Sequence, residues 1–299
     1  MQSCKAFFVL VVLGLVGAQS ATAQPRFGAQ GAEAEPARMQ QWLVPSPDPE
    51  TAAHALLFRP SGDGPFPLAL IAHASTQNVL RRAQMPQPEY RALAAWLVAR
   101  GFAVLVPERP GHGATGGKYL EDQGGCDEAD YSRSGYATAD SIKAALGYLR
   151  EQPFARQDGT VIVGHSAGAW GALALAGENP KGVSVIIAFA PGRGGHANDL
   201  PNQVCAPHTL IQSAADFGDD TRVPVIWLVA ANDSYFSPDL SRQLADAFRT
   251  GGGTVDFRVL PASGSEGHWL AETEAGVKIA GPELDRALKA LSPVAAKKR

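Results

Sequence analysis

The chain has 299 residues, 45% of them hydrophobic, and a formal net charge of −3. This length supports one domain with a full core, and the mild acidity gives none of the concentrated positive charge that nucleic-acid binding requires. Beyond the first 23 residues no segment is apolar for long enough to cross a membrane, so we expect a soluble protein.

Residues 1–23 have the layout of a secretory signal peptide. One basic residue, Lys5, precedes an unbroken apolar run from Ala6 to Val16, and small residues end in Ala21-Thr22-Ala23. The apolar run is too short to serve as a transmembrane anchor. We therefore expect cleavage after Ala23 and export, to the periplasm or to the medium.

After the signal peptide we expect a flexible start, residues 24–36, and a single domain, residues 37–299. The first segment is rich in Ala, Gly, Gln and Glu and has almost nothing to bury. Two short extended segments open the domain, at 42–44 and 54–59. The prolines between them, within 45–49, favour edge strands and turns over helix.

Continuous apolar runs then alternate with helical patterns. The runs are residues 67–72, 103–106, 161–163, 183–189 and 225–231, and a more alternating strand candidate follows at 254–260. The helical patterns are residues 89–99, 138–150, 169–177 and 238–250, with a closing helix at 282–291 that starts at a proline. Strands that are apolar on both faces need helices on both faces. The pattern predicts an α/β fold, a doubly wound, mostly parallel sheet flanked by helices.

Two connections are too long to be plain turns, residues 107–134 and 191–223. Both follow a buried strand, so both are expected at the carboxyl edge of the sheet, where ligands bind in open α/β folds. Each contains one cysteine, Cys126 or Cys205, and a bridge between them is geometrically reasonable. In an exported protein a disulfide is expected rather than two free thiols. It would contribute roughly 4 kcal/mol and hold the two loops over the site.

The segment Gly164-His165-Ser166-Ala167-Gly168 follows an apolar strand and passes at once into a helical pattern. This is the strand, sharp turn and helix of a nucleophile elbow, with Ser166 as the candidate nucleophile. Its flanking residues must be glycines because strand and helix cross closely beside a strained serine. The five-residue pattern alone arises by chance in roughly one such sequence in five, so its context carries the prediction.

A serine nucleophile needs a histidine to take its proton and a carboxylate to hold that histidine. His268 follows the last predicted strand after a flexible loop, whereas His165 adjoins the serine and is turned away from it. Asp233 stands directly after the apolar run 225–231, and its rival Asp239 lies near the start of the next helix. The order Ser, Asp, His is the one that α/β-hydrolases use.

The oxyanion of a tetrahedral intermediate needs backbone donors. We expect the N–H groups of Ala167 and of Ser75, which lies in the loop after the strand ending at Ala72. Four arginines fall in the rim loops and are possible substrate-binding groups, although each is equally compatible with solvated surface: Arg109 and Arg193, with Arg81 and Arg82. His112 is a further possible pocket residue, although its glycine-rich loop favours a backbone role. The remaining histidines have no metal-ligand spacing, so no metal is expected.

As an ordered set, five segments resemble the α/β-hydrolase superfamily and, within it, the dienelactone-hydrolase-like exported esterases. They are residues 71–74 (Ile-Ala-His-Ala), 107–113 (Pro-Glu-Arg-Pro-Gly-His-Gly), 164–168, 231–233 (Ala-Asn-Asp) and 267–268 (Gly-His). The resemblance implies the α/β-hydrolase fold and hydrolysis of a small-molecule carboxylic ester through an acyl-enzyme, with no cofactor.

The chain departs from that family at two positions. Dienelactone hydrolases carry a nucleophilic cysteine where Ser166 stands, and the usual His-Gly after the third strand is His73-Ala74 here. A peptidase or an acyl transferase uses the same triad, and a non-catalytic binding protein can keep the same fold. The sequence leaves these alternatives and the oligomeric state open.

Overall fold

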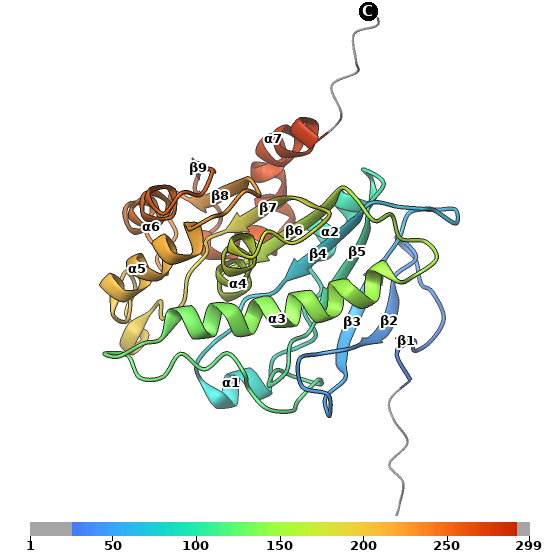
Figure 1. Cartoon of the computed structure of the whole chain (residues 1–299), viewed down its shortest axis with the longest axis horizontal. Coiled ribbons are helices and arrows are strands. Elements are labelled where there is room, and N and C mark those ends of the chain that lie inside the picture. Colours follow the sequence, from blue (N-terminus) through green and yellow to red (C-terminus); the bar gives the residue numbers. More distant parts are fainter. Residues whose placement is uncertain (1–25, 292–299) are drawn as a thin grey trace, which may run out of the picture.

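The computed structural model describes residues 26–291, and these contain a nine-stranded sheet (Figure 1). Its strands, in their order across the sheet, are β1 (Gly28–Ala29), β2 (Gln40–Val44), β3 (Ala53–Phe58), β5 (Ala103–Pro107), β4 (Leu68–Ala72), β6 (Thr160–His165), β7 (Val183–Phe189), β8 (Val225–Ala230) and β9 (Val255–Leu260). The first three strands are antiparallel to their neighbours, and all pairs from β5 to β9 are parallel. The predicted fold class is confirmed.

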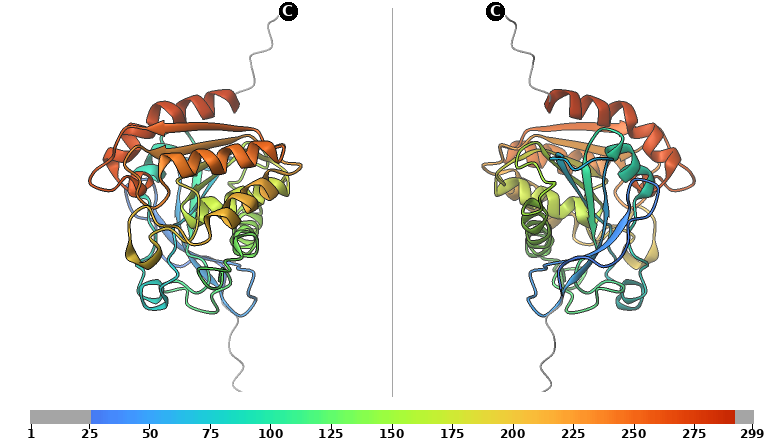
Figure 2. Two further views of the ribbon diagram at one scale, coloured as in Figure 1. Left: turned by 90° about the vertical axis from the view of Figure 1, so that its left-hand side faces the viewer. Right: turned by 90° about the vertical axis from the view of Figure 1, so that its right-hand side faces the viewer.

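Helices cover both faces of the sheet, as the apolar strands require (Figures 1 and 2). One face carries α3 (Tyr131–Arg150), α4 (Ala167–Gly177), α5 (Pro207–Gly218) and α6 (Pro238–Thr250), and the other carries α2 (Arg91–Val98) and α7 (Glu274–Leu291). Each face has its own cluster of buried side chains. Helix α4 is apolar all round because it packs between the sheet and its neighbours α3 and α5.

Several helices differ from the sequence-based expectation, and α5 and α7 differ most. Helix α5 lies inside 191–223, which was expected to be a loop; Leu210, Ala214 and Phe217 form its buried stripe. Helix α7 begins at Glu274, so Pro282 lies inside it and does not start it. The apolar stripe of α7 runs through the proline and packs against the sheet, and this burial offsets the backbone hydrogen bond that proline cannot donate.

The expected flexible start is also corrected over its described part. Strand β1 pairs antiparallel with β2, and the N–H of Gln30 donates to the carbonyl of Gln41 at 2.8 Å. Phe27 packs on Tyr148 of α3, with ring centroids 5.8 Å apart. The amino-acid composition of this segment does not indicate strand β1, because a short edge strand needs only one partner strand and buries very little apolar surface. The predicted signal peptide, residues 1–23, lies outside the described residues.

No helix within residues 26–291 is both long and apolar enough to cross a membrane.

Candidate active site

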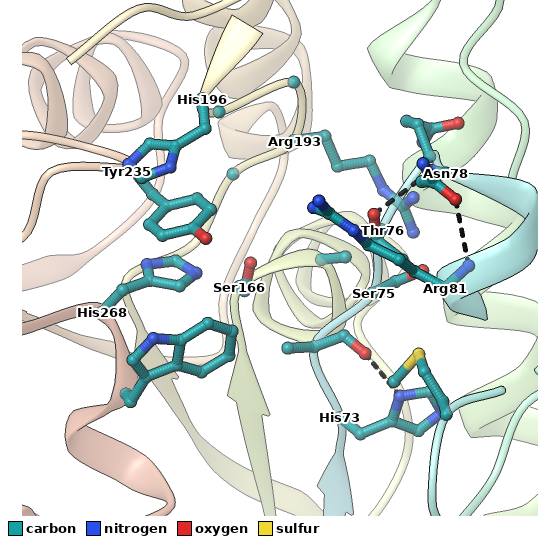
Figure 3. Close-up of a pocket in the computed structure, with 18 of the residues that line it drawn as sticks. His73, Ser75, Thr76, Asn78, Arg81, Ser166, Arg193, His196, Tyr235 and His268 are labelled. Carbon is teal, nitrogen blue, oxygen red and sulfur yellow. Dashed lines mark hydrogen bonds between the residues drawn. The ribbon is translucent and has the colours of Figure 1, made fainter. Parts of the chain in front are cut away.

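A pocket of about 1240 Å³ opens at the carboxyl edge of the sheet (Figure 3). The loops that follow β4, β6, β7 and β8 all begin at this edge, because these strands are parallel to one another. Its lining includes Ser75, Ser166, Ala167, Arg193, Tyr235 and His268. Most of the residues singled out in the sequence are therefore brought together here.

Ser166 sits between β6 and α4 with φ 55° and ψ −118°, a conformation that few residues other than glycine adopt. Its N–H donates to the carbonyl of Phe189, at 2.9 Å. A Cβ on Gly164 would lie 2.3 Å from the Cα of Ala169, and one on Gly168 would lie 2.1 Å from the carbonyl oxygen of Ala72. Both glycines are sterically required, as the elbow pattern predicts.

His268 and Asp233 meet beside this serine. The Nδ1 of His268 lies 3.1 Å from Oδ2 of Asp233, and both side chains are buried. The other carboxylate oxygen accepts from the N–H groups of Tyr235, at 2.8 Å, and Phe236, at 2.9 Å, so the carboxylate is fixed in orientation. In Figure 3 the imidazole of His268 faces the hydroxyl of Ser166. The rival Asp239 lies in the first turn of α6.

The surroundings of His268 keep its imidazole neutral and fix its tautomer. Burial lowers the pKa of His268, and the hydrogen bond and charge of Asp233 offset only part of this effect. Because an ionised carboxylate only accepts hydrogen bonds, Nδ1 carries the proton donated to Asp233. The lone pair of Nε2 is then free to take a proton at neutral pH.

The backbone N–H groups of Ala167, the first residue of α4, and Ser75, after β4, lie at the pocket and have no acceptor among residues 26–291. The N–H of Ala74, in contrast, donates to the hydroxyl of Tyr90 at 3.1 Å. The helix dipole of α4 adds partial positive charge at Ala167. Both residues line the same pocket as Ser166, so these two N–H groups remain the predicted oxyanion donors.

Arg109 and His112 do not line the pocket, contrary to the suggested role in substrate binding. The guanidinium of Arg109 is buried, pairs with Glu121 and donates to the carbonyl of His73 at 2.8 Å. The pKa of Glu121, which burial alone would raise, is held well below its usual value by Arg109 and Arg193. A buried charge needs a buried partner, and Glu121 provides the counter-charge for both arginines.

His112 forms a hydrogen bond with the side chain of Ser75. Its Nδ1 lies 3.0 Å from the carbonyl of Arg109 and 3.1 Å from that of Pro110, so Nδ1 carries the proton. Its Nε2, 2.7 Å from Oγ of Ser75, therefore accepts from that hydroxyl. Burial lowers the pKa of His112 to about 4, which keeps this arrangement at neutral pH. His112 is a positioning residue for the loop after β4.

Of the arginines that the sequence suggested for substrate binding, Arg81 is the one that presents an exposed guanidinium to the pocket. Arg193 lines the pocket, but its guanidinium is buried against Glu121 and donates to Oγ1 of Thr138 at 2.6 Å. Arg82 is stacked on the ring of Tyr119, 3.5 Å from its centroid. Arg81 extends from α1 (Val79–Ala83) into the pocket (Figure 3) and lies 3.7 Å from Asp199, with 70% of its side chain exposed.

Three aromatic residues that the sequence analysis did not select, His196, Tyr235 and Trp269, line the pocket on the side of His268. We call them the aromatic wall. Tyr235 stacks on His268 with ring centroids 4.3 Å apart, and His196 stacks on Tyr235 at 3.5 Å. Trp269 meets His268 edge-on at 5.3 Å. The sequence could have indicated two of them by position, because Tyr235 lies two residues after the candidate acid Asp233 and Trp269 directly follows the candidate base His268.

Cys126 and Cys205 form the expected disulfide, with Cα atoms 4.7 Å apart and a sequence separation of 79. Cys205 lines the pocket, and its N–H donates to the carbonyl of Gly194 at 2.9 Å. The chain-entropy model gives about 4.5 kcal/mol as an upper estimate for its contribution to stability. The bridge ties the loop that carries His196 to the loop before α3. A disulfide is compatible with export.

A mostly parallel sheet with a serine at a strained turn between β6 and α4 defines an α/β-hydrolase. The model of the dienelactone hydrolase family matches residues 58–274, and the chain belongs to this family. It is a carboxylic ester hydrolase.

Solved structures with the same fold have low sequence identity to this chain. The esterase Pf2001 of Pyrococcus furiosus superposes with a TM-score of 0.59 at 14% identity, covering 84% of this chain and 92% of its own. Est1E of Butyrivibrio proteoclasticus, solved with bound ferulic acid, gives 0.58 at 16% identity, covering 83% and 98%. A putative dienelactone hydrolase of Klebsiella pneumoniae gives 0.54 at 17%, covering 84% and 98%. No curated protein sequence matches the chain.

Proposed function

We propose that this hydrolase cleaves small-molecule carboxylic esters with a Ser166-His268-Asp233 triad through an acyl-enzyme. The observation that carries the proposal is the contact of 3.1 Å between Asp233 and His268, beside a serine held at a strained turn. The neutral imidazole, with its proton on Nδ1, is the form that a general base requires.

In the acylation step, Oγ of Ser166 attacks the ester carbonyl while Nε2 of His268 takes the hydroxyl proton. The N–H groups of Ala167 and Ser75 stabilise the oxyanion, and Asp233 stabilises the imidazolium. His268 then gives the proton to the leaving alcohol oxygen as its bond to the carbonyl carbon breaks. A water molecule, deprotonated by His268, attacks the acyl-enzyme, and Ser166 recovers its proton as the carboxylic acid leaves.

A fluorophosphonate probe tests this assignment, because it reacts only with an activated serine. We expect the wild-type protein to be labelled at Ser166 and Ser166→Ala to remain unlabelled. The control is Ser61→Ala, which removes an exposed serine that does not line the pocket and should leave labelling unchanged. Equal labelling of Ser166→Ala and wild type would refute the assignment.

A panel of p-nitrophenyl esters of increasing acyl length tests the substrate range. We expect short to medium acyl chains to react fastest, because the loops over the pocket are held in place by the disulfide and are too short for a large lid. Matched p-nitroanilides test the alternative of a peptidase. Highest activity on long-chain emulsions, or faster cleavage of the anilides, would contradict this proposal.

We further propose that the protein is exported after cleavage behind Ala23. The support is the signal-peptide layout of residues 1–23 together with the Cys126–Cys205 disulfide. Amino-terminal sequencing of the protein secreted by an expressing cell should begin at Gln24. Recovery of an uncleaved chain from the cytoplasm would overturn the proposal.

A further inference from the structure

The two sides of the pocket differ in chemistry. On the side of His268 the aromatic wall presents ring faces and edges, and Trp269 remains 39% exposed there. On the opposite side Thr76, Asn78 and Arg81 are polar (Figure 3). An indole exposed inside a pocket is unfavourable in water and gains free energy when a ligand covers it.

The proposed chemistry determines which part of an ester lies against the aromatic wall. His268 must reach the leaving oxygen to protonate it, so the alcohol portion lies on the side of His268. The carbonyl oxygen must reach the N–H groups of Ala167 and Ser75, and Ser75 lies across the pocket from the wall (Figure 3). The acyl portion occupies the remaining direction, away from both.

We propose that this pocket selects esters whose alcohol carries an aromatic ring, that is, benzylic or phenolic esters. This inference rests on the proposed triad. A planar ring attached to the leaving oxygen extends from Nε2 of His268 along the wall, where Tyr235 and Trp269 already meet at 73° with centroids 5.8 Å apart. Tyr235 is stacked between His196 and His268, so it can offer an edge to a third ring, while Trp269 offers its exposed surface. Aromatic pairs prefer offset-stacked or edge-to-face contacts.

Four esters separate ring recognition on the alcohol side from recognition on the acyl side. Benzyl acetate and methyl phenylacetate are isomers that carry the same ring on opposite sides of the ester bond. Cyclohexylmethyl acetate and methyl cyclohexylacetate are their saturated counterparts. The three leaving alcohols, benzyl alcohol, cyclohexylmethanol and methanol, have similar acidity, so differences in leaving-group ability are small. The quantity to measure is kcat/KM, which includes every step up to departure of the alcohol.

We expect benzyl acetate to exceed cyclohexylmethyl acetate by about fivefold in kcat/KM, the size of one aromatic pair. Methyl phenylacetate and methyl cyclohexylacetate should differ by less than about twofold, since Thr76, Asn78 and Arg81 across the pocket carry no ring. Equal values within the alcohol pair, or a larger ratio within the acyl pair, would overturn the inference. Failure to cleave any of the four would instead refute the proposed ester hydrolysis.

Variants at the wall provide the second test. Trp269→Leu should lower the benzyl-to-cyclohexylmethyl ratio to nearly one, and Trp269→Phe should retain most of it. Because the ratio is taken within one variant, any general loss of activity from disturbing His268 cancels. Trp96→Leu, on α2 and outside this pocket, is the matched control and should keep the wild-type ratio. A ratio unchanged in Trp269→Leu would show that the wall does not contact the alcohol.

Discussion

The buried carboxylate of Glu121 should be essential to stability, and Glu121→Gln tests this. Glu121 is paired with Arg109 and Arg193, and all three side chains are at most 2% exposed. The amide keeps the shape and some hydrogen bonds but removes the negative charge, leaving two buried guanidiniums without a counter-charge. Breaking a buried pair in this way costs about 3–5 kcal/mol. We therefore expect the free energy of unfolding to fall by about that amount.

The measurement is urea unfolding of the disulfide-bonded protein followed by tryptophan fluorescence, with the midpoint as the readout. In thermal unfolding the same loss should lower the Tm by roughly 10 °C. The control is Asp246→Asn, which removes an exposed ion pair with Arg249 whose side chains are 60% and 48% exposed. That pair should be worth less than about 1 kcal/mol. The reasoning is refuted if Glu121→Gln costs no more than this control.

Three further predictions concern the site. Because burial lowers the pKa of His268, kcat/KM should fall only below pH 6.5, where the base becomes protonated; a midpoint above pH 7 would contradict this. His112→Phe should lower kcat about tenfold with little change in KM, and adding Ser75→Ala should cost little more; additive losses would exclude a shared role. Gly168→Ala should cost about 2–3 kcal/mol of stability, whereas Gly147→Ala, with open space at its Cβ, should gain about 0.8; equal effects would argue against the close crossing at the elbow.

The sequence determined the features that depend on local chemistry. Apolar runs long enough to be buried on both faces specified the central strands, and Gly164 and Gly168 specified the tight crossing around Ser166, because a Cβ at either position collides with backbone. Strand order along the chain then placed the residues after each parallel strand at one edge. For this reason His268 reaches the pocket and Asp233 lies directly behind it.

Only the tertiary structure decided which side chains face the pocket. Arg109 and Arg193 looked equivalent in the sequence to Arg81, but both turn to Glu121, which is 12 residues from one and 72 from the other. Conversely, His196 joins the pocket because its loop is bridged to a cysteine far away in the chain. Local patterns encode backbone conformation and burial, whereas the partner of a rim side chain depends on how distant loops pack. Once the fold has formed, the free-energy cost of removing a charge or ring from water determines which partner such a side chain takes.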